Sequence, residues 1–226
     1  MNVVLFGGTG MVGQGVLREC LLDPDVTQVL SVVRSSTGQK HDKLRELVHQ
    51  DFTDFSPLQR ELSGYDACFF CLGVSSAGMS EADYTRVTYD ITLAAARVLV
   101  KANPRMTFVY VSGAGTDSSE KGRSMWARVK GRTENALLAL PFKAKFMFRP
   151  GYIQPMHGIR SKTRWYRAMY ALAAPLFPVL DAAFSNAVTT TERVGRAMLV
   201  VAKRGAPRTL LGNADINALA ASTRAL

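Results

Sequence analysis

The sequence predicts an α/β fold with a doubly wound parallel sheet, and three observations support this prediction. Apolar runs of strand type alternate with amphipathic runs of helical type from Val3 to Arg149, as in strands joined by crossover helices. The first apolar run ends in a glycine cluster that opens the first helix. The 226 residues, 47% of them hydrophobic, contain no internal repeat and no linker rich in Gly, Ser or Pro. We therefore expect one domain over residues 1–226.

The glycine cluster is Gly7-Gly8-Thr9-Gly10-Met11-Val12-Gly13. Gly7 permits a sharp turn out of the strand, Gly10 lets phosphate oxygens approach the backbone, and Gly13 lets the helix pack closely on the strand. The N–H groups and the positive dipole end of the helix then face an anion. A glycine-rich turn without a ligand is the alternative. We expect a dinucleotide pyrophosphate to bind here, with contacts from Gly7, Thr9, Gly10, Met11, Val12 and Gly13.

The predicted second strand, Gln28–Val33, ends in Arg34. In sites that prefer NAD, an acidic residue about 20 positions after the glycine loop binds the ribose 2′-hydroxyl. Arg34 stands near that position with no Asp or Glu beside it, and a guanidinium suits a 2′-phosphate. Ser35, Ser36 and Lys40 offer further donors, whereas a solvated arginine at a strand end is the alternative. The sequence therefore predicts NADP(H) as the cofactor.

The elements that follow keep the same alternation. Lys43–His49 is compatible with a short helix or a loop, before a third strand near Leu47–Gln50. Asp66–Leu72 is a nearly continuous apolar run, as expected of a central parallel strand. Ser80–Lys101 has the apolar spacing of a long helix. The remaining predicted elements are a strand at Met106–Ser112, a helix at Ser124–Leu140, a strand at Phe142–Arg149, a helix opened by a capping box from Thr189 to Glu192, a strand at Thr209–Leu211 and a helix at Asp215–Leu226.

Composition limits the classes of partner and compartment. A net charge of +10 suits acidic ligands, but the basic residues are spread without long runs of like charge, so we expect no nucleic-acid partner. The three cysteines and the closeness of Met1 to the first strand predict a cytoplasmic protein without a targeting segment. Cys68 and Cys71 have C-x-x-C spacing, yet residues three apart on a strand face opposite sides. We therefore expect no redox pair and no metal site.

The C-terminal part, residues 151–226, is predicted to contribute the substrate pocket. Its apolar stretch Tyr166–Phe184 contains Pro175, Pro178 and Asp181. Because a membrane span needs about 20 uninterrupted apolar residues, we expect no transmembrane segment there. The stretch is instead expected to line the pocket or an intersubunit surface, such as that of a homodimer. The polar groups that would reach a small-molecule substrate are Tyr152, His157 and Tyr166.

These motifs together resemble the extended and atypical short-chain dehydrogenase/reductases, and in layout the small NAD(P)H-binding, NmrA-like proteins. The resemblance rests on the glycine cluster, on Tyr84-Thr85-Arg86-Val87-Thr88, on the serine of Val111-Ser112-Gly113 and on Arg149-Pro150-Gly151. It implies a Rossmann fold in which Ser112 holds the substrate carbonyl and Lys130 binds the nicotinamide ribose. It also implies cofactor contacts from Asp51, Phe52, Leu72, Gly73, Lys130, Pro150 and Gly151. Taken alone, Asp51 is equally compatible with a turn or cap residue, and Ser112 with a serine that caps a turn.

Two positions depart from the pattern of that family. Thr88 stands in place of the asparagine of Y-x-x-V-N, and Trp126 in place of the tyrosine of Y-x-x-x-K. An indole cannot usefully release a proton. Ser112 and Lys130 favour an oxidoreductase or epimerase-like enzyme that acts on a small carbonyl or hydroxyl compound. Trp126 favours the alternative, a non-catalytic NADP(H) sensor that presents a surface to a regulatory protein partner.

Overall fold

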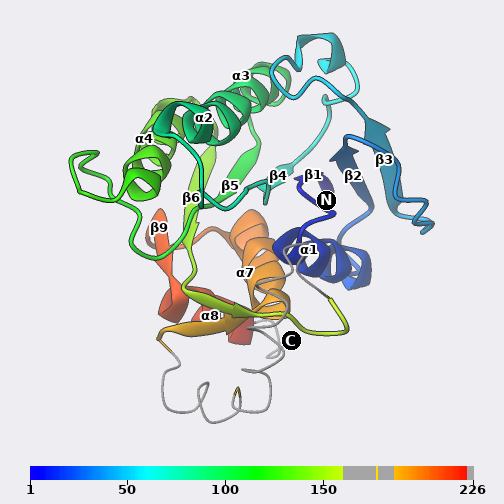
Figure 1. The fold of residues 1–226 in the computed structure, drawn as a ribbon. Helices are drawn as coiled ribbons and strands as arrows, with labels where there is room; N and C mark the ends of the chain where they lie inside the picture. Colours follow the sequence, from blue (N-terminus) through cyan, green and yellow to red (C-terminus); the bar gives the residue numbers. More distant parts are fainter. Residues whose placement is uncertain (160–176, 178–185, 223–226) are drawn as a thin grey trace.

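A seven-stranded sheet forms the centre of the molecule, and every strand pairing in it is parallel (Figure 1). The computed structural model describes residues 1–159, 177 and 186–222. The strand order is β3-β2-β1-β4-β5-β6-β9, so the chain winds outward in both directions from β1 and β4, which confirms the predicted doubly wound fold. The strands are β1 (Asn2–Phe6), β2 (Gln28–Val33), β3 (Leu44–Val48), β4 (Ala67–Phe70), β5 (Thr107–Val111), β6 (Ala144–Arg149) and β9 (Leu210–Gly212).

Helices cover both faces of this sheet (Figure 1). On one face lie α1 (Met11–Leu22), α7 (Thr191–Arg204) and α8 (Asn213–Ala221); on the other lie α2 (Glu81–Thr85), α3 (Ile91–Ala102) and α4 (Met125–Ala139). Successive strand residues point to opposite faces, so each strand serves two cores. In β1, Val3 and Leu5 join the core under α1 and α7, whereas Val4 and Phe6 join the core under α3.

The edge strand β3 begins earlier than the third strand predicted near Leu47–Gln50. The sequence suggests a short helix or a loop over Lys43–His49, but Leu44–Val48 pairs with β2 along its whole length. Because β3 borders the sheet, it is only half-buried and carries Arg45 and Glu46. It therefore lacks the apolar run that marks a central strand.

The predicted helix Ser80–Lys101 is interrupted in the structure. Ser80 caps α2, since its hydroxyl oxygen accepts the N–H of Asp83 at 3.1 Å. The chain then passes through a π-helical turn, η2 (Arg86–Asp90), into α3. This turn packs against α4, and π-turns inside helices occur frequently at functional sites.

The capping of α7 is shifted by one residue from the prediction. Thr190, not Thr189, is the N-cap, and its hydroxyl oxygen accepts the N–H of Arg193 at 3.0 Å. Thr189 belongs to β8 (Val188–Thr190), which pairs in parallel with β7 (Tyr152–Gln154). The sequence does not predict these two strands, because three residues are too few to show alternation.

Cys68 and Cys71 lie on opposite faces of the sheet, as expected from strand geometry. Both thiols are free, and burial raises their pKa above the ordinary value. Among the described residues, no helix is long and apolar enough to cross a membrane. Apart from Phe177, the stretch Tyr166–Phe184 lies outside the described residues, and so does the part it was expected to play in a pocket.

Candidate functional site

The glycine turn lies at the carboxyl end of β1, beside β4, where the strand order reverses. Open α/β sheets bind their ligands at this place. Gly7 adopts a left-handed backbone conformation, with φ of +81°. A Cβ atom on Gly7 would lie 2.6 Å from the backbone nitrogen of Leu72. The turn therefore requires glycine at this position, and it brings the ends of β1 and β4 into contact.

The start of α1 packs against this turn without room for a side chain. A Cβ atom on Gly13 would lie 2.0 Å from the carbonyl oxygen of Gly7, whereas one on Gly10 would lie 3.3 Å from the same atom. The N–H of Gly10 donates to the carbonyl of Gly7 at 2.9 Å and closes the turn. Gly13 is thus required by packing, whereas a Cβ atom on Gly10 would make one tight contact that a shift of a few tenths of an ångström relieves.

The N-terminus of α1 has the features of an anion site. Gly10 is the N-cap, no side chain caps it, and the first turn contains no acidic residue. The side-chain amide of Gln14 donates to the carbonyl of Thr9 at 3.1 Å and steadies the turn from outside. Uncapped N–H groups and the positive end of the helix dipole suit a pyrophosphate.

Lys130 joins this region from α4. Its ammonium group lies 3.8 Å from the position of a Cβ atom on Gly73, donates to the carbonyl of Val111 at 3.1 Å and lies 4.9 Å from the ring centroid of Tyr110. The side chain is buried, with 7% exposure. Burial lowers the pKa of Lys130 to about 8, partly countered by the carboxylate of Glu134. The structure therefore places a cation beside Gly73.

Ser112 follows β5, and its hydroxyl is hydrogen-bonded within the protein to the buried carboxylate of Glu134. Its hydroxyl donates to Oε1 of Glu134 at 2.5 Å and lies 3.0 Å from the carbonyl oxygen of Phe148. Glu134 is fully buried and forms an ion pair with Arg149. The hydroxyl proton of Ser112 is thus used within the protein. Sequence reasoning missed Glu134, because the acceptor lies on a helix 22 residues further along the chain.

Trp126 and Lys130 lie on the same helix, one turn apart, as the spacing predicts. The indole ring of Trp126 is half-buried and packs against the backbone after β5. Its carbon atoms lie 3.8 Å from the position of a Cβ atom on Gly113 and 3.5 Å from that on Gly115. The ring thus occupies the side of α4 that faces the segment after Ser112.

The structure places the remaining predicted cofactor residues around this edge in different roles. Arg34 follows β2 and is exposed. Asp51 accepts the N–H of Thr53 at 2.9 Å and its hydroxyl at 2.5 Å, and these hydrogen bonds lower the pKa of Asp51. Phe52 is buried against the ring of Phe55. Asp51 thus takes part in a turn and Phe52 packs in the core, and their contacts with a cofactor stay predictions.

Pro150 and Gly151 connect β6 to the C-terminal elements. The carbonyl of Pro150 accepts the N–H of Ala114 at 2.8 Å, and the N–H of Gly151 donates to the side chain of Asn213 at 3.0 Å. A Cβ atom on Gly151 would lie 2.7 Å from the carbonyl oxygen of Ala187. These contacts hold the turn after β6 close to the segment after β5.

In the described part of the chain, Tyr84 and the polar groups expected to reach a substrate have partners or are buried. Tyr84 is 2% exposed, and burial raises its pKa above the ordinary value. The hydroxyl of Tyr152 donates to the side chain of Gln154 at 2.6 Å, and burial raises its pKa as well. The imidazole of His157 lies 2.7 Å from a carboxylate oxygen of Glu192. Tyr166 lies outside the described residues.

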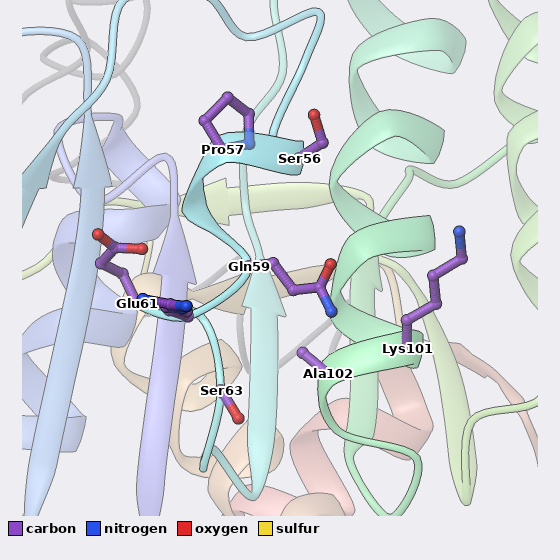
Figure 2. Close-up of a pocket in the computed structure, with 8 residues that line it drawn as sticks. Ser56, Pro57, Gln59, Glu61, Ser63, Lys101 and Ala102 are labelled. Atoms are coloured by element: carbon purple, nitrogen blue, oxygen red, sulfur yellow. The ribbon is translucent and has the colours of Figure 1, made fainter.

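A surface cavity of about 750 Å³ lies away from the glycine turn, between η1 (Ser56–Leu58) and the last turn of α3. Figure 2 shows Ser56 and Pro57 at one end of it, and Lys101 and Ala102 along the side that α3 forms. None of the predicted site residues lines this cavity. It is therefore separate from the candidate dinucleotide site.

The chain matches a family model described as NAD(P)H-binding over residues 7–139, from the glycine turn to the end of α4. It therefore belongs to this NAD(P)H-binding family, and the resemblance to atypical short-chain dehydrogenase/reductases is confirmed. A solved structure of the short-chain dehydrogenase/reductase YIR035C from Saccharomyces cerevisiae shares the fold. The TM-score is 0.63 over 97% of this chain and 98% of that chain, at 19% identity. The cofactor is thus a nicotinamide dinucleotide.

Two relatives are named as mitochondrial proteins. Protein FMP52-2, mitochondrial, from Scheffersomyces stipitis is 29% identical over 66% of this chain and 65% of its own length. Protein fmp52, mitochondrial, from Emericella nidulans is 29% identical over 67% of this chain and 66% of its own length. The chain thus spans just under two thirds of these relatives. Their names contradict the cytoplasmic location expected from the sequence, since free cysteines do not distinguish one compartment from another.

Proposed function

We propose that this protein binds NADP(H) at the carboxyl edge of the sheet, between the glycine turn and Lys130. Support comes from the uncapped start of α1, from the cation beside Gly73 and from Arg34. Arg34 is exposed directly after β2, and it takes part in none of the ion pairs found among the described residues. A free guanidinium at this place suits the 2′-phosphate that distinguishes NADPH from NADH.

We further propose that the protein acts as a non-catalytic NADP(H)-binding protein rather than as a fast carbonyl reductase. The observation that carries this proposal is the hydrogen bond of Ser112. The hydroxyl of Ser112 donates its hydrogen bond to Glu134 instead of to a substrate oxygen. Trp126 supports the same conclusion, because an indole N–H does not supply the proton that an alkoxide needs after hydride transfer. The binding of cofactor would then be read by a regulatory protein partner.

The second candidate is an oxidoreductase or epimerase-like enzyme that acts on a small carbonyl or hydroxyl compound. Lys130 favours it. Its pKa of about 8 lies near the range in which proton transfer at neutral pH is efficient. When bound, the nicotinamide would supply the hydride chemistry, and Lys130 would hold the ribose. In this case the proton would come from another group or from ordered water.

Cofactor titration by calorimetry tests the proposed binding. We expect NADPH to bind more tightly than NADH by about ten- to a hundredfold, the value of a charge-assisted pair with phosphate. The Arg34→Glu variant should lose most of this preference. Arg97→Glu makes the same charge change on the exposed surface of α3 and should retain the preference. Equal affinities of the wild-type protein for the two cofactors would contradict the assignment of NADP(H).

A further inference from the structure

The carboxylate of Glu46 organises the segment that follows Arg34. Glu46 lies on β3, opposite Ser31 of β2 in the strand register. The hydroxyl of Ser36 donates to Oε2 of Glu46 at 2.6 Å. The N–H of Thr37 donates to the same oxygen at 3.0 Å, and the hydroxyl of Thr37 donates to Oε1. One carboxylate on the edge strand thus collects three donors from two consecutive residues.

The segment closes on itself around this carboxylate. The hydroxyl oxygen of Ser36 accepts the N–H of Gly38 at 3.2 Å, and that of Thr37 accepts the N–H of Gln39 at 3.2 Å. Gly38 adopts a left-handed conformation with φ of +72°, which lets the chain turn back. Burial alone would raise the pKa of Glu46, but the donors from Ser36 and Thr37 outweigh burial and lower it. Glu46 is therefore ionised at neutral pH.

The position of this loop gives it a role beyond stability. In the strand register Val32 lies opposite Phe6, so Arg34 lies level with the glycine turn, and the loop begins two residues later. A Cβ atom on Gly8 would lie 2.8 Å from the hydroxyl oxygen of Ser31, which shows how closely the turn approaches β2. Residues 36–38 follow Arg34 with only Ser35 between them, so the conformation of this loop limits where the chain can place Arg34.

We propose that Glu46 is a specificity-determining positioning residue, which fixes the loop at residues 36–38 so that Arg34 is held at the 2′-phosphate of NADPH. This inference rests on the proposed binding of NADP(H). An acidic residue near the adenosine ribose would ordinarily favour NAD by accepting the 2′-hydroxyl. Here both carboxylate oxygens already accept hydrogen bonds from the protein. Glu46 acts through the loop and not on the ribose.

Affinities for NADPH and NADH, measured for each variant by calorimetry, test the inference. Glu46→Ala should weaken NADPH binding about tenfold, comparable to one misplaced charge-assisted hydrogen bond, while NADH binding stays unchanged. The NADPH affinity of Glu46→Gln should lie between those of the wild-type protein and Glu46→Ala, because one oxygen of the glutamine side chain still accepts hydrogen bonds. Glu61→Ala removes a carboxylate on the exposed surface away from this loop and should change neither affinity.

The outcomes separate this inference from the proposed function. A wild-type preference for NADPH that Glu46→Ala leaves intact overturns the role of Glu46 but not the binding of NADP(H). Tighter NADPH binding in both Glu46 variants also overturns it, since the carboxylate would then repel the phosphate. A wild-type protein that binds neither cofactor overturns the proposed function itself. Should Glu46→Ala fail to fold, Thr37→Val removes one donor from the loop side and should lower the preference for NADPH in the same direction.

Discussion

Lys130, Ser112 and Trp126 lie close together around the end of β5, yet they differ in what they can contribute to chemistry. Lys130 faces Gly73 and keeps an ammonium group at the edge of the sheet where the proposed cofactor site lies. The hydroxyl of Ser112 donates its hydrogen bond to the carboxylate of Glu134. Trp126 fills the space beside Gly113 and Gly115 with an apolar ring. These three residues are therefore better suited to holding a cofactor than to turning over a substrate.

Replacement of Trp126 by tyrosine tests this residue-level conclusion. We expect the wild-type protein to reduce simple ketones and aldehydes at least about a hundredfold more slowly than Trp126→Tyr, which is the size of a general-acid contribution. The variant gains a phenol one helical turn from Lys130, whose charge would lower the pKa of that phenol. The measurement is the oxidation of NADPH followed by absorbance, together with the affinity for NADPH, which should change little.

Trp126→Phe is the matched control, because phenylalanine has the ring of tyrosine without the phenolic hydroxyl that donates the proton. It should remain as slow as the wild-type protein. Brisk reduction by the wild-type protein, unaltered in Trp126→Tyr, would show that position 126 is not the proton-donor position.

At the level of the elements, the glycine turn separates what the fold requires from what the ligand requires. Gly13→Ala would force a Cβ atom to within 2.0 Å of the carbonyl oxygen of Gly7, and α1 must move away. We expect a loss of about 1–3 kcal/mol in the free energy of unfolding, as for other overpacked sites. Gly10→Ala places its Cβ atom 3.3 Å from the same oxygen, a tight contact that a small shift relieves, and its φ of −84° suits alanine, so the loss of stability should be smaller.

Gly10→Ala and Gly13→Ala also separate the affinity for the cofactor from the stability of the fold. Gly10→Ala should keep most of the stability of the wild-type protein and lose affinity for NADPH, because the methyl group would occupy the path of the phosphate. Urea unfolding and cofactor titration of both variants provide the measurement. If Gly10→Ala bound NADPH as well as the wild-type protein does, the pyrophosphate would not approach the backbone at this residue.

Elements with a strong local pattern could be predicted from the sequence, and elements set by their neighbours could not. The bounds predicted for β2, Gln28–Val33, agree with the structure because its residues form an apolar run. The edge strand β3 has a mixed pattern, and only its pairing with β2 makes it a strand. The π-turn Arg86–Asp90 leaves no mark on helical periodicity, since one turn of different winding is shorter than the window that reveals the period.

The candidate site divides in the same way. The glycine turn and the pair of Trp126 and Lys130 depend on spacing within one segment, and they could be predicted. The partners Glu46 and Glu134 depend on strand register and on the packing of α4, which join residues 9 or more positions apart. The sequence by itself does not show which carboxylate accepts a hydrogen bond from which hydroxyl. The bond from Ser112 to Glu134 therefore could not be predicted, and the sequence indicated a serine available to a substrate.

At the level of the whole molecule, the C-terminal elements pack on the N-terminal ones: α7 lies against α1, and β9 pairs with β6. In the described part of the chain, α7 packs more extensively on α1 than on any other element, and α8 comes second. A Cβ atom on Gly15 of α1 would lie 2.6 Å from Thr191. The buried carboxylate of Glu19, which is 5% exposed, pairs with Arg196 at 3.1 Å and with Arg18. We therefore expect one cooperative unit, with a site that depends on both halves.

Glu19→Ala tests this cooperation. Removal of the Glu19 carboxylate takes away one of the acceptors of Arg196 between α1 and α7. We expect the free energy of unfolding to fall by about 1.5–3 kcal/mol, the range for a hydrogen bond to a charged group. If the chain is one unit, this loss appears equally in the hydrogen exchange of the amides of β1 and of β9, and urea unfolding stays a single transition. Glu61→Ala, at an exposed position, should leave both unchanged. Faster exchange confined to β9 and α7, with β1 still protected, would mean that the C-terminal elements form a separate unit, and that a dinucleotide site on β1 does not need them.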